Sequence, residues 1–118
     1  MILESITALT LGITGLCGPT ETAWATHEGV VCLDDRFVRF IEKVAPCESR
    51  YGLVIHPGLA IGDHGQSKGM MQIHRPSHEK AMAEAGLDYE QEQDRLLWGQ
   101  HLYLADGPGH WSCWKEKP

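Results

Sequence analysis

Residues 34–48 read DDRFVRFIEKVAPCE, and this stretch predicts the central helix of the protein. An aspartate at its start is a good N-cap, and Pro46 should end or kink the helix near its last turn. The predicted helix therefore ends beside a carboxylate, Glu48, that directly follows a cysteine. Its apolar positions recur at i, i+3, i+4 and i+7 and form one face, at Phe37, Phe40, Ile41 and Val44.

Further helices are predicted in the second half of the chain. Ser77 is a candidate cap for a helix that runs through Ala85 and stops at Gly86. Asp88, with Gln91 three residues later, resembles a capping box for a helix over 89–105. Strand signals are sparse, and glycine and proline recur over 52–68, which is typical of a loop. The sequence predicts a mainly α fold with one long glycine-rich loop.

Composition limits the class of protein. The 118 residues are 42% hydrophobic and 22% charged, which is ordinary for one globular domain. The net charge of −6 argues against a nucleic-acid partner, because such proteins usually carry a basic patch. The sequence contains no run of about 18 apolar residues, so it predicts no membrane span. We expect a monomer.

Four cysteines stand at Cys17, Cys32, Cys47 and Cys113, and none forms a CxxC pair. An even number in so small a chain fits disulfides, and disulfides fit an extracytoplasmic protein. Three pairings remain open at this point. The alternative is four thiols in a cytosolic protein.

The first residues differ from the rest and leave two interpretations open. They carry no lysine or arginine before Arg36, and Ile2 to Leu16 include a 4-3-4-3 apolar spacing that fits an amphipathic helix. The sequence Ala23-Trp24-Ala25 resembles the end of a secretory leader, although Glu4 stands where a leader is basic. Cleavage after Ala25 would leave three cysteines, whereas retention would allow Cys17 to pair with Cys32. Both interpretations stay open. Residues 1–31 are expected to be a leader or an amphipathic helix, and residues 32–118 are expected to form the domain.

Glu48 is the first candidate for chemistry. A carboxylate at the end of an apolar helix is partly removed from water, which favours its protonated form. A glutamate held protonated near neutral pH can act as a general acid. The simpler interpretation is a solvated helix-terminal glutamate.

A second motif follows the glycine-rich loop, where residues 62–74 read GDHGQSKGMMQIH. The order Glu48-Ser49, glycine-rich loop and Gly-Met-Met-Gln-Ile resembles the lysozyme-like superfamily. Its relevant members are soluble lytic transglycosylases, goose-type lysozymes and resuscitation-promoting factors. The resemblance covers about residues 32–118, and it implies a small lysozyme-like fold with a sugar cleft.

The resemblance also implies roles for particular residues. Glu48 matches the catalytic acid of the family, and Gln72 would offer its amide to the substrate. The cysteine before the acid implies a Cys47–Cys113 disulfide. Many transglycosylases carry Ala-Tyr-Asn-x-Gly on a late helix, whereas residues 103–107 here lack the asparagine. The residues expected to bind substrate are Ser49, Gly69, Met70, Gln72, Ile73, His74 and Tyr103.

The implied reaction is cleavage of the glycosidic bond between N-acetylmuramic acid and N-acetylglucosamine in peptidoglycan. Glu48 would protonate the leaving oxygen, and the substrate's own C6 hydroxyl can complete the reaction to a 1,6-anhydro product. Asp63 matches a second carboxylate of goose-type lysozymes and would support hydrolysis, but it also fits a simple turn residue. A lytic transglycosylase is favoured over a lysozyme. No cofactor or metal is implied, and the enzyme would be secreted, periplasmic, wall-associated or part of a phage virion.

Two other functions compete with this one. The chain can be a non-catalytic glycan-binding or virion module with the same fold. It can also be a metal-binding protein, because His74 and His78 have i, i+4 spacing, although Pro76 lies between them. The acidic residues Glu90, Glu92 and Asp94 are interpreted as the solvated start of a helix.

Overall fold

The computed structural model describes residues 17–48, 61–62, 65–111 and 113. A β-hairpin comes first, in which β1 (Glu21–Thr26) pairs antiparallel with β2 (Gly29–Asp34). Helix α2 (Asp35–Glu48) follows without a break, as the apolar spacing predicted. Pro46 lies inside the last turn of α2 rather than beyond its end.

A small antiparallel sheet lies in the middle of the chain. It contains β3 (Ile61–Gly62), β4 (Ser67–Lys68) and β5 (Ile73–His74), in that order. A loop was expected over residues 52–68, but the last part of this stretch contains the two short strands β3 and β4. The other described elements are helices α3 (Arg75–Glu84) and α4 (Glu92–Asp106) and the 3-10 helix η5 (Gly107–His110).

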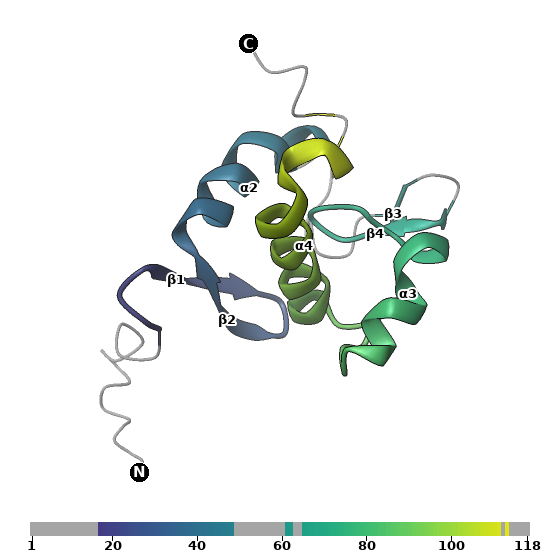
Figure 1. Cartoon of the computed structure of the whole chain (residues 1–118), viewed down its shortest axis with the longest axis horizontal. Coiled ribbons are helices and arrows are strands. Elements are labelled where there is room, and N and C mark those ends of the chain that lie inside the picture. The colour runs from purple at the N-terminus through teal and green to yellow at the C-terminus, as the bar shows by residue number, and fades with distance from the viewer. Residues whose placement is uncertain (1–16, 49–60, 63–64, 112, 114–118) are drawn as a thin grey trace.

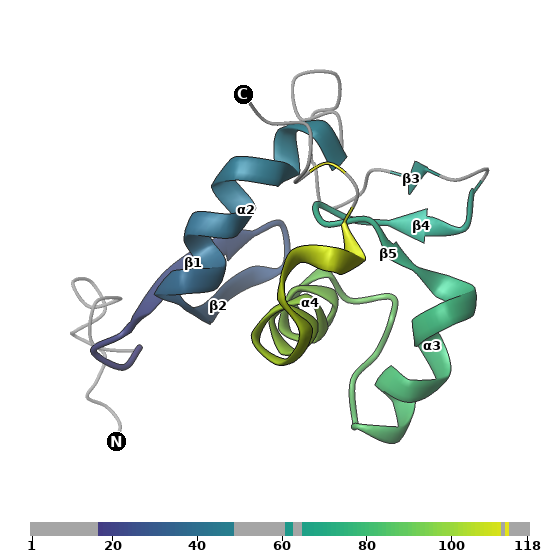
Figure 2. The same cartoon turned by 45° about the horizontal axis from the view of Figure 1, so that its top comes forward.

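Helix α4 occupies the centre of the molecule. In Figures 1 and 2 the hairpin and α2 lie on one side of it, and α3 with the small sheet lies on the other. Burial of apolar side chains from all these elements forms one core. Its most deeply buried apolar side chains are Leu33, Phe37, Ile41, Val44, Met71, Met82 and Leu96.

Both helix starts in the second half of the chain differ from the prediction. Helix α3 begins at Arg75 with His74 as its N-cap residue, so the expectation that Ser77 is the cap is wrong. Helix α4 begins at Glu92, because the Glu28 carboxylate accepts hydrogen bonds from the backbone N–H groups of Glu92 (2.8 Å) and Gln93 (3.0 Å). A cap supplied by a side chain 64 residues earlier leaves no local signal in the sequence.

The boundary expected after residue 31 falls inside β2, and the structure shows no break there. Ala23, Trp24 and Ala25 lie in β1, opposite Cys32, Val31 and Val30. The apolar stripe from Ile2 to Leu16 lies outside the described residues, and so does the choice between a leader and a helix there.

Two disulfides close the fold, Cys17–Cys32 and Cys47–Cys113, with Cα–Cα distances of 5.5 and 6.0 Å. Both pairs agree with the expectation, and together they indicate an extracytoplasmic protein. No helix among the described residues is long and apolar enough to cross a bilayer.

Candidate active site

Glu48 ends α2 and is half-buried. Its Oε2 accepts a hydrogen bond of 3.1 Å from the backbone N–H of Cys113. Cys113 is itself bonded to Cys47, the residue before Glu48. The end of α2 is therefore connected to Cys113 twice, by the hydrogen bond to the Glu48 carboxylate and by the disulfide to Cys47.

The Gly69–Ile73 motif forms a tight turn between β4 and β5. The backbone N–H of Gln72 and its side-chain Nε2 both donate to the Gly69 carbonyl, at 3.1 and 2.8 Å. Gln72 has a φ of 51° and Gly69 a φ of 94°, a region that a residue with a side chain rarely adopts. The Gln72 amide, expected to bind substrate, thus also holds the turn together.

A buried ion pair lies directly beneath this turn. Glu92 and Arg95 are only 2% and 1% exposed, and their charged groups approach to 3.0 Å. Glu92 Oε2 also accepts a hydrogen bond of 3.2 Å from the Met70 backbone N–H, and Arg95 donates to the Tyr89 carbonyl. A Cβ added to Gly69 would lie 2.5 Å from Glu92 Oε1, so only glycine fits above the pair.

This ion pair was not predicted from the sequence. The expectation that Glu92 lies on a solvated face is wrong, because the side chain is buried against Arg95. Of the other two acidic side chains in that cluster, Glu90 is exposed and pairs with Arg75 and with Lys68 at 3.1 Å. Asp94 is half-buried and accepts a hydrogen bond of 2.8 Å from the Asp88 backbone N–H. The hydrogen bond from Arg75 holds the pKa of Glu90 down at about 2.

Burial has the opposite effect on Glu92. Removal from water raises the pKa of Glu92 to about 7, even though Arg95 and the Met70 N–H favour its charged form. The only sequence signals for the pair are the i, i+3 spacing of the two charges and the apolar Leu96 beside them.

Trp111 connects the two halves of the candidate site. Its indole Nε1 donates a hydrogen bond of 2.9 Å to the Met71 carbonyl in the glycine turn. Its ring meets Phe40 of α2 edge-on, with centroids 5.2 Å apart. Cys113 donates to Glu48, so Trp111 and Cys113 together connect this end of the chain to the turn and to the carboxylate.

The remaining predicted residues have different surroundings. Ser49 and Asp63 lie outside the described residues. The side chains of Met70 and Ile73 are buried, at 7% and 3% exposed, so they support the turn from the core. His74 Nδ1 lies 2.8 Å from Ser77 Oγ.

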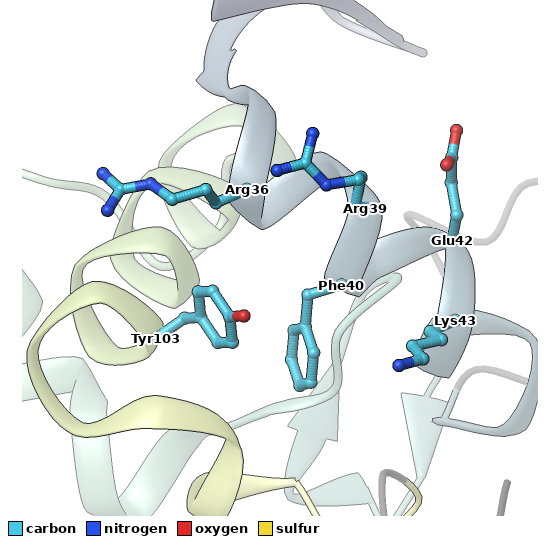
Figure 3. Close-up of a pocket in the computed structure, with 6 residues that line it drawn as sticks. All are labelled: Arg36, Arg39, Phe40, Glu42, Lys43 and Tyr103. Atoms are coloured by element: carbon cyan, nitrogen blue, oxygen red, sulfur yellow. The ribbon is translucent and has the colours of Figure 1, made fainter. Parts of the chain in front are cut away.

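Tyr103, the last of the predicted site residues, comes from α4 and packs against α2. Its ring stacks on Phe40 at a centroid distance of 4.4 Å. Tyr103 also lines a surface pocket that Figure 3 shows. The structure thus places it beside the Phe40–Trp111 contact that leads to the turn.

The described residues give little support to a metal site. The group with suitable donor spacing is Cys17, Glu21 and Cys32, but its two sulfur atoms form a disulfide and are not thiolate ligands. His78 accepts a hydrogen bond of 3.1 Å from Trp98 Nε1, and burial lowers the pKa of its ring. The histidine therefore has a packing role in the structure.

Comparison of the chain with protein-family models, with curated proteins and with solved structures gives no match. The function is therefore argued from the residues and geometry of the site.

Proposed function

We propose that the protein is a peptidoglycan-cleaving glycosidase and that Glu48 is its general acid. The observation that carries the proposal is the setting of Glu48, which is half-buried and fixed through Cys113. A general acid must be held within hydrogen-bond reach of the oxygen that it protonates, and Glu48 is held at one of its two carboxyl oxygens. The resemblance of the Glu48-Ser49 and Gly69–Ile73 motifs to lysozyme-like enzymes supports the substrate class.

The hydrogen bond from Cys113 gives the two oxygens of Glu48 different roles. Oε2 accepts the N–H, so Oε1 carries the proton that is transferred. Glu48 gives this proton to the glycosidic oxygen as the C1–O4 bond breaks and positive charge develops on the muramic acid ring. The glucosamine O4 leaves as a hydroxyl, and Glu48 becomes a carboxylate.

A transglycosylase completes the reaction without water. The Glu48 carboxylate accepts the proton of the C6 hydroxyl, whose oxygen attacks C1 and closes the 1,6-anhydro ring. Hydrolysis would instead need a water molecule and a second carboxylate, a role for which the chain offers Asp63. We favour the anhydro product, and we place the reaction at the cell wall, outside the cytoplasm or in a phage virion.

The test is digestion of purified peptidoglycan by the unmodified protein and by Glu48→Gln. Glutamine keeps an acceptor for the Cys113 N–H but cannot transfer a proton, so soluble muropeptides should fall by at least roughly a hundredfold. Mass spectrometry identifies 1,6-anhydro ends or reducing ends among the products. Glu84→Gln, an exposed change on α3, is the matched control and should retain full activity.

Each result has a definite meaning. Anhydro products that disappear in Glu48→Gln support the transglycosylase, and reducing ends would assign hydrolysis and promote Asp63. Equal activity of Glu48→Gln and the unmodified protein would refute the role of Glu48. No soluble product from a folded protein would favour the non-catalytic glycan-binding module.

A further inference from the structure

The pocket in Figure 3 lies between α2 and α4 and has a volume of about 610 Å³. Figure 3 shows Glu42 pointing away from Tyr103, whereas the Lys43 ammonium is directed toward the side where Phe40 lies. A smaller pocket of about 320 Å³ shares Arg36 and Arg39 with it. The residues that line the larger pocket are Arg36, Arg39, Phe40, Glu42, Lys43 and Tyr103.

Two of the three cations in this pocket form no direct ion pair with a described residue, although Arg39 lies near enough to Asp34 to help lower the pKa of that carboxyl. Arg36 is matched, because its guanidinium binds both carboxylate oxygens of Asp34, at 3.0 and 2.8 Å. Arg39 and Lys43 form no ion pair with any of the residues that the structure describes. Like charges four residues apart destabilise a helix slightly, and here they occur in a chain with a net charge of −6. This arrangement favours an anionic ligand.

Apart from Glu42, the polar side chains that line the pocket are donors. Arginine and lysine side chains only donate hydrogen bonds, and the phenolic hydroxyl of Tyr103 can also donate. The Tyr103 ring is stacked on the buried ring of Phe40, which fixes its position. Donors around a rigid aromatic pair suit a carboxylate, which is an acceptor at both of its oxygens.

The pocket lies on the part of α2 that leads to Glu48. Arg36, Phe40, Lys43 and Cys47 follow one another at i, i+4, i+7 and i+11, so they share one stripe of the helix. At a rise of 1.5 Å per residue, Lys43 stands about 7.5 Å before Glu48 along the axis. Along the axis, a ligand in the pocket would therefore lie within about two turns of Glu48, whose side chain leaves α2 about 140° around the helix from Lys43.

We propose that this pocket binds carboxylate groups of the short acidic peptide that peptidoglycan carries on its muramic acid. The proposal rests on the proposed function for the identity of the ligand. Arg39 and Lys43 bind the carboxylates, and Tyr103 donates a hydrogen bond to one of them. The uncharged N-acetylglucosamine units of the same strand have no need of these cations.

The first experiment measures binding without turnover. The free stem peptide, and the same peptide with its carboxylates converted to amides, are titrated into the catalytically inactive Glu48→Gln protein by calorimetry. We expect the acidic peptide to bind, the amidated peptide to bind at least roughly tenfold more weakly, and Lys43→Gln in the same background to weaken the acidic peptide roughly fivefold. Lys80→Gln, which removes one exposed lysine from α3, is the matched control and should change nothing.

The second experiment uses active protein and distinguishes this proposal from the proposed function. On glycan strands that carry peptides, Lys43→Gln should raise KM roughly fivefold and leave kcat unchanged, and on peptide-free strands it should change neither. Failure of the unmodified protein to cleave any strand would refute the glycosidase, while peptide binding in the first experiment would still support the pocket. Equal binding of the acidic and amidated peptides, or binding only of a polyglycerol phosphate, would overturn the peptide site.

Discussion

The two disulfides hold very different parts of the molecule. Cys17–Cys32 closes a separation of 15 residues and joins the start of the chain to a hairpin that already has six paired positions. Cys47–Cys113 closes a separation of 66 residues and joins the end of α2 to the C-terminal segment. One disulfide reinforces local pairing, whereas the other joins segments that lie far apart in the sequence.

The difference shows where the candidate site depends on covalent support. The hairpin has a second connection to the fold, since Glu28 caps α4 through two backbone N–H groups. Around Glu48, the described connections to Cys113 are the disulfide and a hydrogen bond of 3.1 Å. We therefore expect the Cys47–Cys113 bridge to affect activity as well as stability, and the Cys17–Cys32 bridge to affect stability alone.

Replacement of both Cys47 and Cys113 by serine should have the largest effect. The chain-entropy model gives a loss of about 4 kcal/mol in the free energy of unfolding for a loop of this length. Glycan cleavage should also fall strongly, because the Cys113 N–H no longer holds the Glu48 carboxylate. Urea unfolding measures the first effect, and release of soluble muropeptides under native conditions measures the second.

The control for that variant is activity per folded molecule. Cleavage is normalised to the folded fraction seen by near-ultraviolet circular dichroism, so loss of stability alone cannot explain a loss of turnover. Unchanged normalised activity in the Cys47→Ser/Cys113→Ser protein would contradict a positioning role for the bridge.

Replacement of Cys17 and Cys32 by serine should have a smaller effect. For the shorter loop, the same model gives a loss of about 3 kcal/mol. Normalised activity should remain at the unmodified level, because the described contacts of Glu48 do not involve the hairpin. A matching loss of normalised activity in this variant would remove the distinction between the two bridges.

The sequence predicted α2 well because one apolar face determines it. Phe37, Phe40, Ile41 and Val44 are all buried, and their spacing needs no information from elsewhere in the chain. The hairpin was missed, because Ala23-Trp24-Ala25 also fits the end of a leader and only pairing with β2 makes it a strand. Pairing of this kind depends on tertiary context.

The sequence suggested the residues of the candidate site, which stay a prediction, but it did not indicate the contacts that hold them. Glu48 and the Gly69–Ile73 motif stand out as local patterns. The Cys113 N–H, the Trp111 indole and the Glu92–Arg95 pair reach the site from α4 and from beyond it. Glu92 differs locally from its exposed neighbour Glu90 in having Arg95 three residues later, and that spacing alone does not show that Glu92 is buried beneath Gly69.

Titration of Glu92 offers the finest test of how the two regions differ. Its backbone N–H donates to Glu28 of the hairpin, and its carboxylate accepts from Met70 in the turn. Its pKa is raised from 4.5 to about 7, so the folded protein binds more protons than the unfolded chain between these values. The free energy of unfolding should therefore fall as pH rises from about 4.5 to 7, with a slope of at most one proton.

A second group contributes to the pH dependence of stability. Because the pKa of His78 is lowered in the folded protein, its titration raises the free energy of unfolding as pH rises. The effect of Glu92 is therefore isolated by comparing the unmodified protein with Glu92→Gln. We expect urea unfolding at several pH values to show this slope in the unmodified protein and in Glu90→Gln, and to show it absent in Glu92→Gln. A slope that persists in Glu92→Gln would mean that another group titrates, and that the carboxylate beneath the glycine turn stays charged throughout.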